Sequence, residues 1–284
     1  MRTVFSAVTA AFLFTVVAFT ACKKDNSTPA GSTSQNNYSS PVSLARMPDP
    51  GNLNSVKIFA VQTHGQYLAA ALGAYNSGVL SLDNSAANVN SQLTWTKTFF
   101  LNVDTPTTIA LWNVAPGVVV NDYNSGTLAV MLHLNRFDAL PPTLYKTYAQ
   151  RIVDAVRAYV NGNETIDIMS ICEQTFGLMS ADPALDNVSK QKLAAIIGVT
   201  ESSWTYWNAQ IDNWPLAVNY PNLSSVGFKA TMSDRSKKVG LFLAADAMGA
   251  LDGAAWGSAA PGVGTVAGAV CIGALYSGFA AWSW

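Results

Sequence analysis

Residues 141–163 read PPTLYKTYAQRIVDAVRAYVNGN and show the clearest secondary-structure pattern in the chain. Two prolines open the segment, where a missing N–H group costs little, and Asn161-Gly162 supplies a helix stop. Between these ends the larger apolar residues recur at helical spacing, so they share one face of a helix. That face consists of Tyr145, Tyr148, Ile152, Ala155 and Tyr159. The segment therefore predicts an amphipathic α-helix.

The same periodicity predicts further helices on both sides of this segment. Their ranges are Asn54–Tyr75, Thr105–Ala115, Thr127–Phe137, Thr165–Met179, Asn187–Ile197 and Thr200–Trp214. Alternating patterns typical of strands are scarce, and Leu93–Val103, with its Thr, Trp and Phe residues, is the best strand candidate. We therefore expect a mainly α fold, with a multi-helix domain over residues 41–235.

The C-terminal segment, residues 236–284, is predicted to form an apolar helical hairpin packed on that domain. Two stretches rich in glycine and alanine, Val239–Trp256 and Val263–Trp282, flank the turn sequence GSAAPG. Glycine costs about 1 kcal/mol in a helix interior relative to alanine, so its regular repetition favours two helices packed backbone to backbone. The repeating glycines, four residues apart in each helix, are Gly249, Gly253 and Gly257, then Gly264 and Gly268.

This segment resembles the glycine-zipper hairpins of pore-forming bacterial toxins and of bacteriocin-like peptides. The resemblance leaves three roles open: a hairpin buried in the domain, a membrane-active element, or an oligomer interface. Asp246 and Asp252 lie inside the first helix, and each carboxylate costs about 2.5–3.5 kcal/mol at a bilayer centre. Asp246 shares its face with the glycines, which indicates a paired or functional carboxylate in the packing seam.

The first 21 residues have the layout of a secretory signal peptide. Arg2 supplies a positive charge, and an uncharged run of apolar and small residues follows from Val4 to Ala21. The run ends in FTAC, with Cys22 last, and this tetrapeptide resembles the lipobox of bacterial lipoproteins. The following residues, CKKD, resemble the mature start of many lipoproteins from the Bacteroidota. The resemblance implies that Cys22 carries a diacylglyceryl group and an N-acyl chain such as palmitate.

A lipidated Cys22 would anchor the protein in the membrane of the cell envelope, with the outer membrane favoured over the inner. Residues 26–40 are uncharged and polar with one aromatic residue. Such a composition is typical of a flexible tether, which we place at residues 22–40.

The composition limits the partners. Lys and Arg number 16 against 17 Asp and Glu, and charged residues make up 12% of the chain, about half the usual share of roughly 25%. The near-zero balance argues against nucleic acid as a partner. A surface with so few charges repels other molecules weakly, which favours a binding partner such as an envelope protein or a glycan, or a homo-oligomer.

No motif for catalysis is present. His64 and His133 belong to no HExxH sequence, and no Gly-x-Ser-x-Gly elbow occurs, so we expect partly buried helix histidines with local hydrogen bonds. A Ser-His-Asp site assembled from distant residues stays open. Cys172 and Cys271 show no metal-ligand spacing and are either paired or buried. We therefore predict no catalytic, cofactor-binding or metal-binding residue.

The aromatic residues supply the remaining candidates. Four large side chains share one helix face and are expected in the core: Trp204, Trp207, Ile211 and Trp214. Tyr206 and Tyr220 lie off that stripe and are better candidates for an exposed contact. Together these features predict a lipid-anchored envelope lipoprotein with a non-enzymatic binding or assembly role. The alternatives are a membrane-active, toxin-like protein that uses the hairpin, and an envelope hydrolase.

Overall fold

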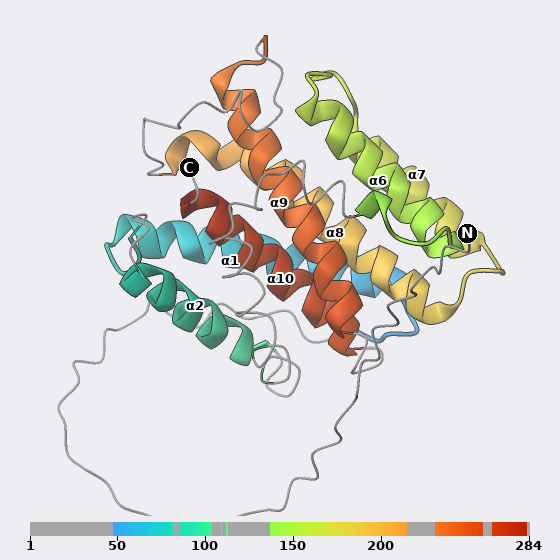
Figure 1. The fold of residues 1–284 in the computed structure, drawn as a ribbon. Helices are drawn as coiled ribbons and strands as arrows, with labels where there is room; N and C mark the ends of the chain where they lie inside the picture. Colours follow the sequence, from blue (N-terminus) through green and yellow to red (C-terminus); the bar gives the residue numbers. More distant parts are fainter. Residues whose placement is uncertain are drawn as a thin grey trace, which may run out of the picture. The chain divides into compact units, whose positions relative to one another are not determined.

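A computed structural model describes residues 48–81, 86–103, 109, 112, 137–214, 231–257 and 263–282 (Figure 1). These residues contain seven α-helices and no strand, which confirms the mainly α, multi-helix class. The helices are α1 (Leu53–Asn76), α2 (Ala86–Leu101), α6 (Leu144–Val160), α7 (Ile168–Ala181), α8 (Asn187–Gln210), α9 (Asp234–Trp256) and α10 (Val263–Trp282). A short 3-10 helix, η1 (Ile211–Asn213), follows α8.

Several helices begin at a side chain that caps the backbone. Thr143 accepts a hydrogen bond from the Lys146 N–H at the start of α6, and Asp186 accepts one from the Ser189 N–H at the start of α8. Such caps pair N–H groups that the first turn of a helix leaves free. At the other end of α6, Gly162 has a φ of 91°, a conformation that favours glycine. The predicted amphipathic helix therefore forms between the Thr143 cap and Gly162.

Two sequence predictions are wrong. Residues Leu93–Val103 were the best strand candidate, but they lie in α2 up to Leu101. The buried residues of α2, including Leu93, Thr96 and Phe100, recur at helical spacing on its inner face. Packing on that face outweighs the β-propensity of Thr and Phe, which depends on context.

The second error concerns α8, for which the sequence predicts two helices, Asn187–Ile197 and Thr200–Trp214. The structure has one continuous helix to Gln210. Gly198 does not interrupt it but lies where α8 crosses α1, and a Cβ there would be 2.5 Å from the Lys57 carbonyl oxygen. The glycine permits a close crossing. The predicted helices Thr105–Ala115 and Thr127–Phe137 lie almost entirely outside the described residues.

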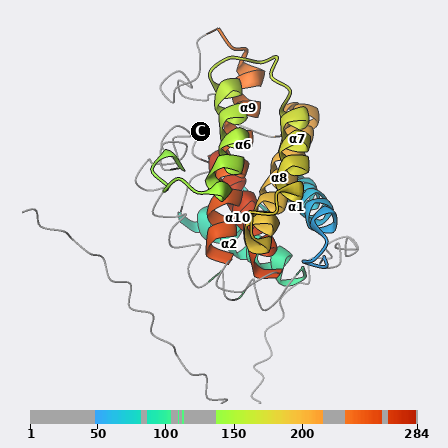
Figure 2. The same ribbon diagram turned by 90° about the vertical axis from the view of Figure 1, so that its right-hand side faces the viewer.

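The C-terminal hairpin forms the centre of the domain. α9 packs against α10, α8 and α6, while α10 also packs against α8, α1 and α2. Figures 1 and 2 show α6 and α7 side by side on one flank of this hairpin and α2 on the other. Both hairpin helices are buried over most of their described length. The hairpin therefore supplies a large part of the hydrophobic core.

The glycines bring the two hairpin helices together backbone to backbone. A Cβ at Gly253 would overlap the Gly268 carbonyl group, one at Gly257 would overlap that of Gly264, and one at Gly249 would lie 2.7 Å from the Ile272 carbonyl oxygen. Real Cβ contacts are essentially never shorter than 3.0 Å. We refer to these contacts as the hairpin seam. No described helix has the length and apolarity needed to cross a bilayer.

Candidate functional site

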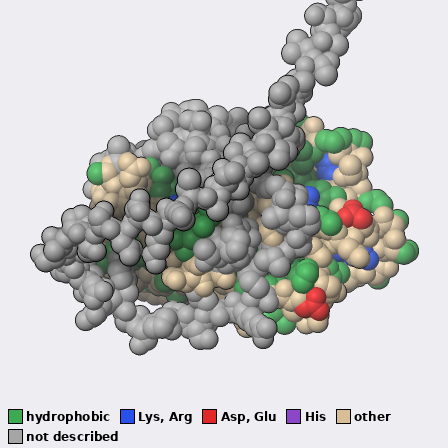
Figure 3. Space-filling model, turned by 90° about the horizontal axis from the view of Figure 1, so that it is seen from below, with side chains coloured by type: hydrophobic (Ala, Val, Ile, Leu, Met, Phe, Trp, Pro, Cys, Tyr) green, Lys and Arg blue, Asp and Glu red, His purple; other side chains and the backbone are tan. Residues whose placement is uncertain are grey.

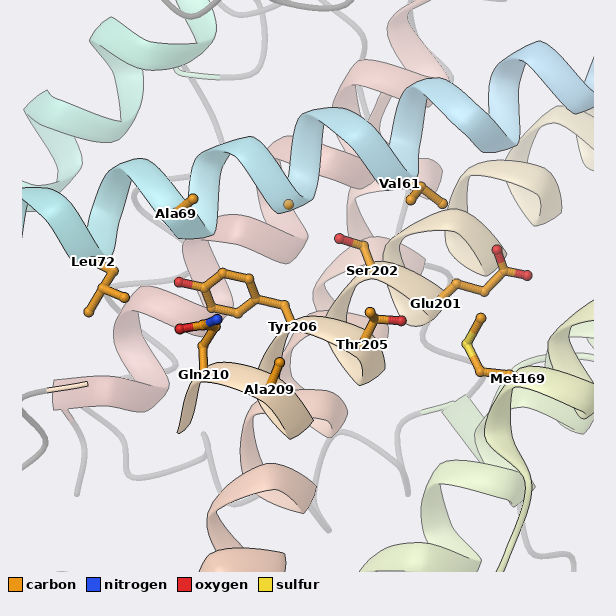
Figure 4. Close-up of a pocket in the computed structure, with 11 residues that line it drawn as sticks. Val61, Ala69, Leu72, Met169, Glu201, Ser202, Thr205, Tyr206, Ala209 and Gln210 are labelled. Carbon is orange, nitrogen blue, oxygen red and sulfur yellow. The ribbon is translucent and has the colours of Figure 1, made fainter. Parts of the chain in front are cut away.

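The described residues contain a groove between α1 and α8 with a volume of about 580 Å³ (Figure 4). Pockets that bind small molecules in proteins typically measure about 300–1,000 Å³. Helix α1 contributes Val61, Gly65, Ala69 and Leu72 to one wall, so this wall is apolar. Helix α8 contributes hydroxyl, amide and carboxyl groups to the other wall. We call this site the α1–α8 groove.

The polar wall follows from the spacing of residues on α8. Glu201, Thr205 and Ala209 recur every four residues, and Ser202 and Tyr206 lie beside them on the same face (Figure 4). Thr205 and Ala209 are exposed at the rim, whereas Glu201 and Ser202 are buried at the floor. The groove thus offers apolar contact on one side and hydrogen-bonding groups on the other.

Charged side chains lie at one end of the groove, around Glu201. Lys57 Nζ lies 3.2 Å from Glu201 Oε1 and 3.5 Å from Glu173 Oε1, and 4.9 Å from the centre of the Phe176 ring. Burial raises the pKa of Glu201 above its ordinary value, and Lys57 offsets part of this effect. Because two carboxylates face one lysine, this end of the groove carries a net negative charge when both acids are ionised.

The predicted contact residue Tyr206 is part of the groove. Its hydroxyl donates to the Leu68 carbonyl oxygen at 3.0 Å and accepts from Trp214 Nε1 at 3.2 Å. Burial raises the pKa of Tyr206 to about 12. Both hydrogen-bonding roles of the hydroxyl are therefore used inside the protein, and the ring rather than the hydroxyl is available to a ligand. Tyr220 and Cys22 lie outside the described residues.

Directly behind the groove lies a buried polar cluster, which joins α1, α8, α9 and α10. The Ser202 hydroxyl is 3.3 Å from His64 Nδ1, and His64 Nε2 is 3.5 Å from Asp246 Oδ1. Asp246 Oδ2 accepts a hydrogen bond from Trp207 Nε1 at 2.9 Å, and Oδ1 accepts one from the Ser277 hydroxyl. We call these five residues the polar cluster.

All members of the polar cluster are buried: His64 and Asp246 have 0% exposure, and Ser202 has 5%. His64 Nε2 has no hydrogen bond of normal geometry, since 3.5 Å exceeds the usual N–H···O length of about 2.7–3.2 Å. A buried polar atom without a partner costs free energy, so such an arrangement needs an explanation.

The sequence did not reveal this cluster. It predicted partly buried histidines with local hydrogen bonds, whereas His64 is fully buried and its partner Ser202 lies 138 residues away. No local motif can signal a contact that only the folded helices create. His133 lies outside the described residues. Asp246, singled out for its place among the hairpin glycines, lies in that seam and is held by Trp207 and Ser277.

The other candidates lie in the core. Trp207 is fully buried and stacks on Phe242 with ring centres 4.0 Å apart, Ile211 and Trp214 are also buried, and Trp204 is partly buried. Cys172 and Cys271 are free and buried, and burial raises the pKa of both thiols. Within the described ranges, no group of three or more His, Cys, Asp or Glu side chains is placed to hold a metal ion.

Comparisons with known proteins provide no further guide to the site: no family model, no curated protein and no solved structure matches this chain. The groove and the polar cluster must therefore be interpreted from their own chemistry.

Proposed function

We propose that the protein is a lipid-anchored lipoprotein of the cell envelope, held in the outer membrane through Cys22, that binds a small amphiphilic molecule in the α1–α8 groove. The observation that carries this proposal is the groove itself, with one apolar and one polar wall. Amphiphiles are abundant at a membrane surface, where a lipid anchor would hold the domain.

The charge at the end of the groove favours one class of ligand. Glu201 is buried there, and Lys57 faces both Glu201 and Glu173. A ligand with an amine or hydroxyl head group would donate a hydrogen bond to the Glu201 carboxylate, while its alkyl part lies along Val61, Ala69 and Leu72. A carboxylate head group would meet net negative charge at the same place.

The position of the hairpin supports a binding role over the membrane-active alternative. Insertion would require α9 and α10 to leave the core and would expose Asp246, which is fully buried and hydrogen-bonded.

The surface outside the groove is also consistent with a protein that interacts weakly through charge. On the face seen in Figure 3, charged side chains are few among the described residues.

The experiment uses the mature chain from residue 22 onward, with Cys22→Ser so that neither lipid nor detergent competes for the groove. The probe is the apolar dye N-phenyl-1-naphthylamine, followed by fluorescence and displaced by dodecylamine or dodecanoate. We expect dye binding that Ala209→Trp weakens at least about tenfold, because the indole fills the groove. We also expect dodecylamine to displace the dye at lower concentration than dodecanoate.

The matched control is Ala181→Trp, which places the same side chain on an exposed helical position at the end of α7. Equal dye affinity in both variants would contradict the proposal. If the Cys22→Ser chain with an open groove binds no dye, but an envelope protein or a glycan protects its groove residues from cleavage, that macromolecule replaces the amphiphile as occupant. Anchoring is tested separately, by mass spectrometry of the N-terminal peptide: a Cys22 without a thioether-linked lipid would overturn it.

A further inference from the structure

We propose that Ser202 is a nucleophile toward carboxylic esters that bind in the α1–α8 groove, with His64 as its general base and Asp246 as a positioning residue. This inference rests on the proposed function, because the ester must enter the same groove. It adds a chemical activity to the binding role proposed for the groove, and it assigns residues to a Ser-His-Asp site that the sequence left open.

The contact between Ser202 and His64 has the arrangement that general-base catalysis requires. The serine hydroxyl lies 3.3 Å from Nδ1, and neither atom has another hydrogen-bond partner among the described residues. A neutral imidazole with its proton on Nε2 therefore presents its free lone pair at Nδ1 to the hydroxyl. A base in this position can take the serine proton as the oxygen attacks.

Asp246 completes the arrangement from the opposite side of the imidazole. Its Oδ1 lies 3.5 Å from His64 Nε2, so the carboxylate lies beside the imidazole at slightly more than hydrogen-bond length. Trp207 and Ser277 both donate to this carboxylate and fix its orientation. In serine hydrolases a buried carboxylate holds the histidine tautomer and stabilises the imidazolium that forms during attack. The same division of roles fits these three residues.

The serine is reachable from the groove because of Gly65. Ser202 is one of the groove-lining residues and is labelled in Figure 4, and Gly65 of α1 also lines the groove. A Cβ added at Gly65 would lie 3.3 Å from the Ser202 hydroxyl oxygen, so the missing side chain leaves that oxygen uncovered. Ser202 is 5% exposed and lines the groove, so an ester bound in the groove would lie beside this residue.

Stabilisation of the oxyanion comes from side chains in this site. The backbone N–H groups around Ser202 lie inside α8 and are used by the helix. Thr205, three residues further along α8, places a hydroxyl on the same wall of the groove. A site with few donors forms an acyl-enzyme slowly, because each oxyanion donor contributes about 10²–10³-fold in rate. Covalent labelling is therefore a better first readout than turnover.

The reaction balances without a cofactor. The Ser202 oxygen bonds to the ester carbonyl carbon while its proton moves to His64 Nδ1. The bond from that carbon to the alkoxy oxygen then breaks, and the leaving alcohol takes the proton from Nδ1. Water attacks the acyl-serine in the second half, gives one proton to Nδ1 and releases the carboxylic acid as Ser202 regains its proton. An ester with an alkyl chain fits the apolar wall.

The test treats the same mature Cys22→Ser chain with a biotin-tagged alkyl fluorophosphonate, which exchanges its P–F bond for a P–O bond to an activated serine. Peptide mass spectrometry locates the label. We expect it on Ser202, absent in Ser202→Ala, and formed at least about tenfold more slowly in His64→Gln, since a general base contributes about 10²–10⁴-fold. Ser203→Ala is the matched control, because Ser203 is buried with no hydrogen-bond partner for its hydroxyl.

Two measurements, labelling rate and dye affinity, distinguish a positioning role of Asp246 from a purely structural one. In Asp246→Asn we expect slower labelling with unchanged dye affinity, since the groove itself stays intact. If His64→Gln fails to fold, Gly65→Leu keeps all five residues of the polar cluster, covers the Ser202 hydroxyl and should abolish labelling. Dye binding without labelling of Ser202 would overturn the inference and leave the proposed function standing. Loss of both dye binding and Ser202 labelling would overturn the inference and the proposed function together. If His64→Gln does not slow labelling, His64 is not the general base for Ser202.

Discussion

The hairpin seam and the α1–α8 helix pair both have small residues where two helices face each other. In the seam these residues allow close packing throughout, whereas in the α1–α8 pair they allow it at one crossing and leave a groove further along. Throughout the seam, glycines of α9 and α10 meet backbone to backbone and leave no space. Helices α1 and α8 meet equally closely at Gly198, where a Cβ would be 2.5 Å from the Lys57 carbonyl oxygen. Further along, Gly65 and Ala69 face a groove. A small residue therefore gives close packing where the backbone of a second helix lies against it, and leaves space for a groove where no second backbone does.

The strongest test of this contrast is a branched side chain in the seam. Gly253→Val places a Cβ where the Gly268 carbonyl group lies, and neither backbone can move without displacing the hairpin. Overpacking typically costs about 1–3 kcal/mol, and a backbone clash belongs to the larger cases. We expect the free energy of unfolding to fall by at least about 3 kcal/mol, measured by urea denaturation. A loss below about 1 kcal/mol would show that the helices separate easily.

The next largest effect is expected at the polar cluster, which joins the seam to the groove. Asp246→Ala leaves Trp207 Nε1 and the Ser277 hydroxyl buried without their acceptor and removes the carboxylate beside His64. A buried donor left without its acceptor typically costs about 1–3 kcal/mol. Denaturation of Asp246→Ala and of the isosteric Asp246→Asn measures this effect. The alanine variant should lose more stability, and equal losses would contradict a hydrogen-bonding role for the carboxylate.

A glycine on the open face of α1 should respond in the opposite direction. A Cβ at Gly73 meets nothing within 4 Å, and the residue is exposed in the helix. Alanine restricts the unfolded chain and is the better helix former, so Gly73→Ala should stabilise the protein by about 0.5–1 kcal/mol. Thermal unfolding measures the change. A destabilised variant would mean that another part of the molecule covers this face.

The smallest effect concerns the charged end of the groove. Because burial raises the pKa of Glu201 in the folded protein, its contribution to stability is present at low pH and is lost as pH rises through the folded pKa. Glu201→Gln has no ionisable group at this position, so the variant does not lose this stability as the pH rises. The stability of the variant relative to the unmodified protein should therefore increase between about pH 4 and pH 7. Urea denaturation at both pH values measures it, and a relative decrease would show that pairing with Lys57 outweighs burial.

The sequence predicted the parts of this structure that depend on local pattern. The helical period around Tyr148 and Ile152 predicted α6, and the glycine spacing identified the segment that forms the hairpin. Context was decisive elsewhere: Thr96 and Phe100 favour strands by propensity but lie on the buried face of α2. Gly198 falls between the two helices predicted at Asn187–Ile197 and Thr200–Trp214, but it lies inside α8 at a helix crossing. The polar cluster was beyond sequence reasoning, because it joins four helices that only the tertiary structure brings together.

The central claim is that the α1–α8 pair, unlike the hairpin seam, is open to a ligand. A fluorescence titration of the mature Cys22→Ser chain with N-phenyl-1-naphthylamine, run beside Ala209→Trp and Ala181→Trp, tests it most directly. We expect one saturable dye site per chain, with its affinity retained in Ala181→Trp and weakened at least about tenfold in Ala209→Trp. Absence of saturable binding, or equal binding by both variants, would contradict it.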